Sequence, residues 1–171
     1  PQTHTLIPWL TILNNIVLGY RLRRTKKPYT QARELLKQLG LEDALDKYPA
    51  QLSGGMQQRV ALARILIEKR PIVLMDEPFS ALDFEMTLFI REKLQEVFIQ
   101  TGTTMMLVSH DLEEAVYLAD QVLLLTKRPT SIAEILHYND PRPRTVATLS
   151  EANFVATKKR SLEVFQREVR R

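Results

Sequence analysis

The 171-residue sequence is long enough to form one domain with a buried core. Hydrophobic residues make up 44% and charged residues 26% of it, a globular balance that excludes a wholly disordered chain. The net charge of +4 is modest, and the absence of cysteine excludes a disulfide framework and a thiolate metal site. Its short basic runs are typical of solvated surface, so we expect no nucleic-acid partner.

Chain-level features also bear on location. The longest apolar runs fall short of the roughly 20 residues that a membrane-spanning helix needs, so we expect any membrane role to depend on a partner. The sequence begins with Pro1 rather than Met, which suggests a fragment or a processed start.

The first part of the chain is predicted to be helical. Thr11 caps a helix that runs through Val17, and Thr30 caps a second helix that Gly40 ends. Ser53 opens a third helix, from about Gly55 to Glu68.

After this helical part, strands and helices alternate. In chain order we expect a strand at Ile72–Met75 buried on both faces, a helix at 84–100, a second buried strand at 103–108, a helix at 112–119, strands at 122–125 and 132–136, an extended connector at 142–150, and a final helix at 151–170. Leu162, Phe165 and Val169 are predicted to lie on one face of that last helix. This order predicts an α/β fold with a mostly parallel sheet, which follows a helical part in the chain.

An acidic pair follows the first predicted strand. Asp76 and Glu77 stand at its carboxyl end, where active sites of open α/β sheets lie, and Pro78 ends the strand. Asp76 would hold Mg²⁺ directly or through water, and Glu77 would orient an attacking water. The alternative is a strand followed by an acidic helix cap.

A serine and two glycines mark the start of the third predicted helix. In the stretch LSGGMQQR, Ser53, Gly54 and Gly55 place a hydroxyl and bare backbone N–H groups at the positive end of the helix dipole. That arrangement is an anion site or, alternatively, a plain serine-capped turn.

A histidine follows the second predicted strand. His110 leaves the strand in the stretch VSHD and could contact a phosphate at the same sheet edge as Glu77. A structural histidine is the alternative.

Together, LSGGMQQR, VLMDEP, SALD and VSHD, in this order and at these spacings, resemble the ATP-binding-cassette (ABC) ATPases. The resemblance implies an ABC ATPase fold of the P-loop class, with a helical signature subdomain and the cofactors ATP and Mg²⁺. It places the signature motif at Leu52–Gln57, the Walker B strand at Ile72–Asp76 and the D-loop at Ser80–Asp83.

Roles for individual residues follow from the same resemblance. It makes Glu77 the catalytic carboxylate, His110 the switch histidine and Asp76 a metal ligand. Gln2 would be the Q-loop glutamine that senses Mg²⁺, and the stretch Leu6–Thr11 would meet a transmembrane subunit. The signature and D-loop side that would face a nucleotide comprises Ser53, Gly54, Gly55, Gln57 and Asp83.

The phosphate loop of the family is missing. None of the five glycines begins a GxxxxGK motif followed by Ser or Thr. We therefore expect an N-terminally truncated chain that cannot hydrolyse ATP alone. Its expected parts are 1–70 (Q-loop and helical subdomain), 71–140 (catalytic core) and 141–171 (C-terminal extension).

The resemblance is strongest to ATPase subunits of nitrate, sulfonate and taurine importers. It implies transmembrane permease subunits, a second ATPase subunit in a head-to-tail dimer, an indirectly coupled solute-binding protein, and a peripheral location on the cytoplasmic face of the membrane. Two alternatives are a soluble ABC ATPase outside transport and a regulatory subunit that supplies only a signature motif.

Overall fold

The computed structural model describes residues 6–68 and 70–170. The chain forms two compact units, Pro1–Met106 and Leu107–Arg171, and each is described by itself. The units divide the chain differently from the expected parts 1–70, 71–140 and 141–171, whose boundaries stay predictions.

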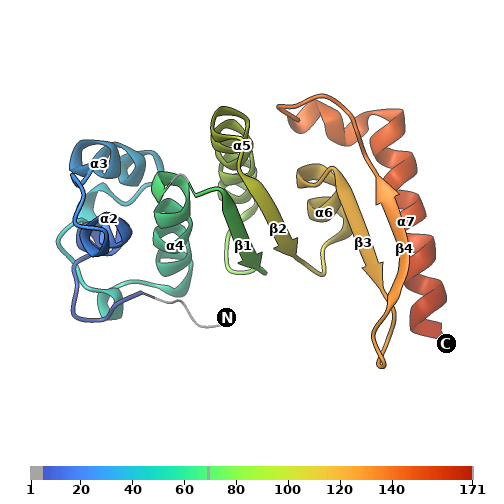
Figure 1. The fold of residues 1–171 in the computed structure, drawn as a ribbon, viewed down its shortest axis with the longest axis horizontal. Helices are drawn as coiled ribbons and strands as arrows, with labels where there is room; N and C mark the ends of the chain where they lie inside the picture. The colour runs from blue at the N-terminus through green and yellow to red at the C-terminus, as the bar shows by residue number, and fades with distance from the viewer. Residues whose placement is uncertain (1–5, 69, 171) are drawn as a thin grey trace. The chain divides into compact units, whose positions relative to one another are not determined.

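The elements alternate largely as the sequence indicates (Figure 1). The helices are α1 Ile12–Ile16, α2 Leu18–Leu22, α3 Tyr29–Gln38, α4 Gly54–Glu68, α5 Phe84–Thr101, α6 Leu112–Leu118 and α7 Ala152–Arg170. The strands are β1 Ile72–Asp76, β2 Thr104–Val108, β3 Gln121–Leu125 and β4 Ile132–His137. Short 3-10 turns lie at Glu42–Ala44, Pro49–Gln51 and Val146–Ser150.

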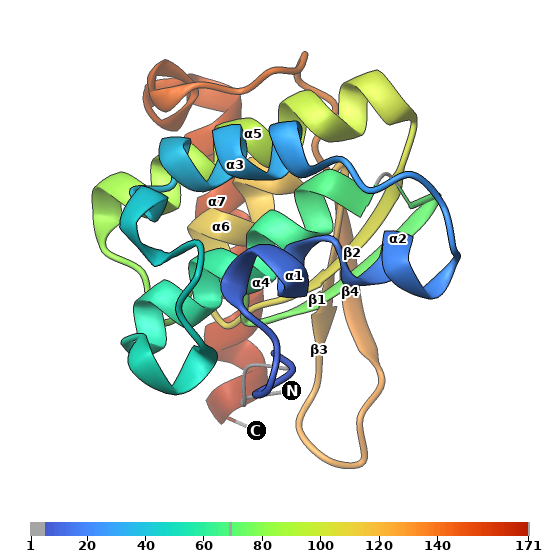
Figure 2. The ribbon, with the colours of Figure 1, turned by 90° about the vertical axis from the view of Figure 1, so that its left-hand side faces the viewer.

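The helices of the first unit bury apolar faces against one another, and Figure 2 looks onto them. Helix α1 contacts α3 and α4, so the core gathers side chains from all three. Its members are fully or almost fully buried and include Ile12, Ile16, Leu36, Val60 and Ala63. Thr11 caps α1 by accepting a hydrogen bond from the Asn14 N–H at 3.4 Å, as predicted.

The start of α3 corrects one prediction. The Pro28 carbonyl already accepts a helical hydrogen bond from the Ala32 N–H at 2.9 Å, so Pro28, not Thr30, is the N-cap. Proline suits a helix start because it has no N–H to leave unpaired. The predicted stop at Gly40 is confirmed by its φ of +65°, a conformation that favours glycine.

Strands β1 and β2 lie side by side and run in the same direction (Figure 1), with α5 as the connection between them. At their start, the Thr104 N–H donates to the Pro71 carbonyl at 2.8 Å. This parallel pair confirms the predicted α/β character.

The burial of β1 differs from the prediction. Val73 and Met75 are buried, but Ile72 is 65% and Leu74 71% exposed, so only one face of this strand is covered. A continuous apolar run does not report which residues lie on the second face, and here no described element covers it.

The second unit is built on an antiparallel hairpin. Strand β3 pairs with β4, with Gln121 opposite His137 and a register shift between Leu124 and Leu125. Helices α6 and α7 pack on the hairpin and on each other. The sheet of this unit is therefore antiparallel, since two strands joined by a short turn run in opposite directions.

Two of the apolar residues that were predicted to share one face of α7 are exposed. Leu162 is 45% and Phe165 51% exposed, whereas Phe154, Ser161 and Val164 are buried. Helix periodicity puts neighbouring positions about 100° apart, so a buried stripe can pass beside the apolar residues that suggested it. The expected extended connector also ends in the 3-10 turn at Val146–Ser150.

We find no helix in residues 6–68 and 70–170 with the length and apolar character needed to span a bilayer.

Candidate functional site

The acidic pair lies at the end of β1. Asp76 is the last residue of the strand and its side chain is exposed, while Glu77 is half-buried. Glu77 has a φ of +48°, in the left-handed region that a residue with a Cβ rarely adopts. Such backbone conformations persist where the surroundings hold them and cluster at functional sites.

Hydrogen bonds from two directions hold the Glu77 backbone. Its carbonyl accepts from the Ser80 N–H at 3.4 Å and from the Ser80 hydroxyl at 3.1 Å, which closes the turn on the D-loop side. The same carbonyl accepts from the Gln58 side-chain amide at 3.3 Å. The strand tip is thus tied both to the following turn and to helix α4.

The D-loop leads into α5. Asp83 is its N-cap, because its carboxylate accepts a hydrogen bond from the Met86 N–H at 2.9 Å. Asp83 is exposed, so its second role as a nucleotide-facing residue stays a prediction.

The serine and two glycines lie at the start of α4, as predicted. Ser53 and Gly54 are exposed, and the Ser53 hydroxyl accepts from the Met56 N–H at 3.3 Å. A Cβ built on Gly54 would meet no other described atom within 4 Å, so its backbone is open to approach. Since α4 is 15 residues long, its N-terminus combines a developed helix dipole with accessible N–H groups.

Gln57 uses its side chain locally. Its amide donates to the carbonyls of Pro49 at 3.0 Å and Leu52 at 3.3 Å. These bonds fix the turn that precedes α4, and the predicted contact of Gln57 with a nucleotide stays a prediction.

The start of α4 and the D-loop approach each other closely. A Cβ built on Gly55 would lie 2.9 Å from the carbonyl oxygen of Ala81, too close for a side chain unless the backbone moves. Glycine is therefore required at this position by packing inside the unit. Two of the predicted motifs, signature and D-loop, are in contact within one chain.

The predicted switch histidine lies in the second unit. His110 is exposed in the loop between β2 and α6. On either side of it, the Ser109 hydroxyl accepts from the Asp111 N–H at 3.0 Å, and Asp111 caps α6 by accepting from the Glu113 N–H at 2.8 Å. A shallow hollow adjoins this loop, and its lining includes His110, Glu113, Lys158, Leu162 and Phe165.

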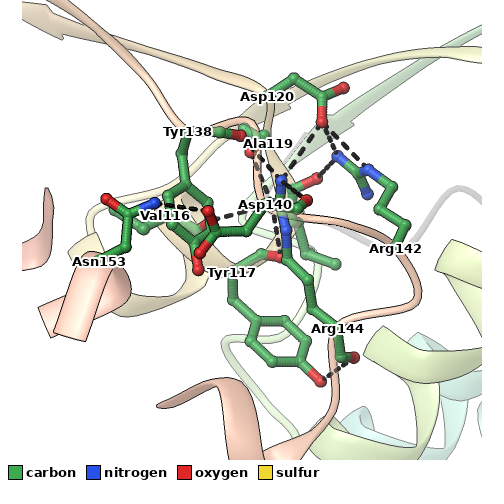
Figure 3. A network of polar contacts seen from close by, with 10 residues as sticks. Val116, Tyr117, Ala119, Asp120, Tyr138, Asp140, Arg142, Arg144 and Asn153 are labelled. Carbon is green, nitrogen blue, oxygen red and sulfur yellow. Dashed lines mark hydrogen bonds and ion pairs between the residues drawn. The ribbon is translucent and has the colours of Figure 1, made fainter. Parts of the chain in front are cut away.

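The far end of α6 is held by a buried arginine (Figure 3). Arg144 is fully buried and donates to backbone carbonyls at distances of 2.7 to 3.3 Å. The carbonyls belong to Val116, Tyr117, Ala119, Tyr138 and Asp140. Three of these groups lie at the C-terminal end of α6, where carbonyls have no helical partner and a cation is favoured.

Aromatic side chains complete this network. The Arg144 guanidinium lies 4.4 Å from the centre of the Tyr138 ring, and the Tyr117 hydroxyl donates to the Arg144 carbonyl at 2.6 Å. Burial lowers the pKa of Arg144 from its usual value, while Asp120 acts in the opposite direction. Burial also raises the pKa of the Tyr138 hydroxyl.

Sequence reasoning missed two residues that organise these loops. Gln58 belongs to the stretch LSGGMQQR, but no feature of the neighbouring sequence distinguishes its role from that of Gln57. Arg144 sits in the sequence PRPR, where an arginine usually indicates exposed surface. Its only sequence signal is its place in a polar segment between a strand and the last helix.

The metal site can be tested against the donor set. In residues 6–68 and 70–170 there is no cluster of three or more His, Cys, Asp or Glu side chains that could hold a metal alone. Mg²⁺ is commonly held by one or two carboxylates with phosphates and water, and the exposed Asp76 fits that requirement. Gln2, the other predicted metal ligand, lies outside the described residues.

The predicted catalytic pair is divided between the units. Glu77 belongs to Pro1–Met106 and His110 to Leu107–Arg171, so each is placed only within its own unit. Their convergence on one phosphate stays a prediction.

Comparison with known sequences connects these motifs to one group of proteins. A family described as "ABC transporter" matches residues 1–80. An uncharacterised ABC transporter ATP-binding protein of Methanocaldococcus jannaschii is 41% identical over 98% of this chain and 62% of its own length. An aliphatic sulfonates import ATP-binding protein of Bacillus cereus is 37% identical over 97% of this chain and 64% of its own length. The chain therefore spans less than two thirds of the length of these relatives.

Solved structures agree with the sequence matches. A dimeric bacterial ABC transporter cassette is similar with a TM-score of 0.70 and 31% identity, over 81% of this chain and 61% of that one. A post-hydrolysis state of the same cassette, bound to ADP and Pi, gives a TM-score of 0.71 and 32% identity, over 82% of this chain and 62% of that one. The predicted fold class is confirmed by these neighbours.

Proposed function

Because this chain belongs to the ABC transporter ATPase family, we propose that it is part of an ATP-hydrolysing subunit that drives solute import. The observation that carries the proposal is the acidic tip of β1. There an exposed Asp76 adjoins a Glu77 whose unusual backbone is held by hydrogen bonds from α4 and from the following turn.

The roles of this tip follow from carboxylate chemistry. ATP would supply the phosphoryl group, and Mg²⁺ bound with it would neutralise charge during the transfer. Asp76 would hold the cation, and Glu77 would accept a hydrogen bond from the attacking water and orient it toward the phosphate. His110 would contact the same phosphate from the loop before α6.

The turn at the start of α4 would serve a different nucleotide. Ser53 and the glycines Gly54 and Gly55 expose a hydroxyl and N–H groups that suit phosphate oxygens. In the head-to-tail dimer that the family resemblance implies, these groups would face ATP bound by a second ATPase subunit. The similar solved cassettes are described as dimeric, which supports this assembly.

The class of solute and the partners are inferred from the names of similar proteins. Similar proteins are named as import ATP-binding proteins for aliphatic sulfonates, nitrate and taurine and as a bicarbonate transport ATP-binding protein. We infer that the imported solute is a small anion or a sulfonate-bearing compound. The partners would be transmembrane permease subunits and, through them, a solute-binding protein, with this subunit on the cytoplasmic face of the membrane.

One alternative has an observation in its favour. Ser53 and Gly54 are exposed at the start of α4, so these groups could complete a nucleotide site on an intact ATPase subunit. Such a signature-only subunit would stimulate hydrolysis in trans and would not hydrolyse ATP itself.

The test of the proposal is Glu77→Gln in the full-length protein with its permease. Removing the carboxylate is expected to keep ATP binding and to lower turnover about 10²- to 10⁴-fold. Glu85→Gln is the matched control, because Glu85 is an exposed acid in the first turn of α5. Turnover that survives in Glu77→Gln would assign the water-orienting role to another group.

A further inference from the structure

Gln58 is a buried amide at the centre of the first unit's motifs. It lies on α4 and is only 6% exposed. Its Nε2 donates to the carbonyls of Glu77 and Pro78, and its Oε1 accepts from the Ala81 N–H at 3.0 Å. One side chain therefore bonds the backbone on both sides of the turn that follows β1.

The position of these bonds matters because of the conformation of Glu77. A non-glycine residue at φ +48° is strained and is kept there by its surroundings. Ser80 holds the turn from within, and Gln58 is the side chain that holds it from α4. Without the Gln58 amide, the Glu77 and Pro78 carbonyls would lose a donor and the Ala81 N–H an acceptor.

The same region contains the close approach between Gly55 and the Ala81 carbonyl. Gly55 and Gln58 are three positions apart on α4 and therefore lie on one face of the helix. That face is packed against the segment 77–81 by a tight backbone contact and by the Gln58 hydrogen bonds. A shift of α4 would be transmitted to the Glu77 backbone.

We propose that Gln58 is a positioning residue for Glu77, which it keeps in its left-handed conformation and ties to the Ser53–Gly55 turn of the same chain. The inference rests on the proposed function for the catalytic role of Glu77. It deepens that function, because the Ser53–Gly55 turn would contact a nucleotide held by the second ATPase subunit while Glu77 acts on the chain's own nucleotide. Gln58 would then link the two sites of a dimer.

The first test is spectroscopic and does not depend on catalysis. In the full-length protein labelled at glutamate, the strength of the intraresidue HN–Hα NOE and the one-bond Cα–Hα coupling report whether Glu77 has a positive φ. Gln58→Leu removes both donors and the acceptor and is expected to abolish the positive-φ signature. Gln51→Leu is the matched control, since Gln51 also accepts a hydrogen bond from a backbone group, but that group is the Tyr48 N–H and not part of the segment 77–81.

The second test separates positioning from general loss of structure. Gln58→Leu is expected to lower kcat about 10- to 100-fold while the KM for ATP changes little, because the Glu77 carboxylate is displaced rather than removed. Gln58→Glu keeps an acceptor for Ala81 and loses the donors, so it should give the same two effects if Gln58→Leu does not fold. Gln51→Leu should leave both quantities unchanged.

The outcomes are distinct. A positive-φ Glu77 in a folded Gln58 variant overturns the inference, whatever the turnover. If the NMR measurements show that Glu77 has lost its positive φ but kcat is unchanged, while Glu77→Gln abolishes turnover, the inference is also overturned. If Glu77 has lost its positive φ in the Gln58 variant but the Glu77→Gln variant still hydrolyses ATP, the result would support the structural link and refute the proposed catalytic role of Glu77.

Discussion

Replacing Arg144 by methionine tests how much one buried cation contributes to the second unit. Methionine is similar in length, but it cannot donate hydrogen bonds. The substitution would leave carbonyls at the end of α6, among them those of Val116 and Ala119, without their buried donor.

The expected cost follows from the kind of contact removed. Leaving a buried acceptor without its donor costs about 1–3 kcal/mol, and Arg144→Met would do this to several carbonyls at once. A domain has only about 5–15 kcal/mol of unfolding free energy in total, so the loss should take a large share of it. Arg144→Lys keeps the charge but cannot reach all five carbonyls. Its free energy of unfolding should lie between those of the wild type and Arg144→Met.

Urea denaturation of the full-length protein, followed by circular dichroism and by hydrogen exchange of the α6 amides, measures this cost. The exchange readout should show α6 opening first. Arg160→Met is the control, because its ion pair with Glu134 is on the same unit but solvent-exposed, and it should change the midpoint little. An Arg144→Met midpoint close to that of Arg160→Met would refute the reasoning.

Three further predictions concern other parts of the chain. Gly55→Ala should weaken the contact between α4 and the D-loop, since its Cβ would lie 2.9 Å from the Ala81 carbonyl, and turnover of the full-length protein should fall; unchanged turnover and stability would contradict this. The hydrogen bond from Arg160 holds the pKa of Glu134 below its usual value, so its stabilisation is present above the unfolded-state pKa and is lost as the pH falls through the folded-state pKa. Denaturation at a series of pH values should therefore show a small difference between wild type and Glu134→Gln at neutral pH, as expected for a surface ion pair, that disappears in acid. A difference that persists in acid would argue against the ion pair. The 171-residue chain alone should show no Mg-dependent ATP turnover in a phosphate-release assay, and turnover at rates typical of the family would show that a phosphate loop is dispensable.

Local features of the fold were predictable because they depend on near neighbours in the chain. The cap at Thr11, the stop at Gly40 and the strand–helix alternation after Ile72 follow from side chains within a few positions of each other. The places of several motif residues at the ends of strands and helices were likewise predictable from spacing. Asp76 and Glu77 lie at the strand end where the sequence indicated they would.

Predictions about burial failed where they depended on distant parts of the chain. The pattern at Ile72–Met75 could not reveal that Ile72 and Leu74 would be exposed. The pattern on α7 did not reveal whether Leu162 and Phe165 would be buried, and both are exposed because the helix meets β3, β4 and α6 through a neighbouring stripe.

The sequence by itself determined most of the local elements and the family motifs on which the proposed chemistry rests. Only the tertiary structure decided that Gln58 holds the turn at Glu77 and that Arg144 holds the end of α6. The physical reason is that both side chains satisfy backbone groups far away in the chain, 23 positions away for Gln58 and Ala81 and 28 for Arg144 and Val116. Such partners are selected by packing, and no pattern within a single segment reports them.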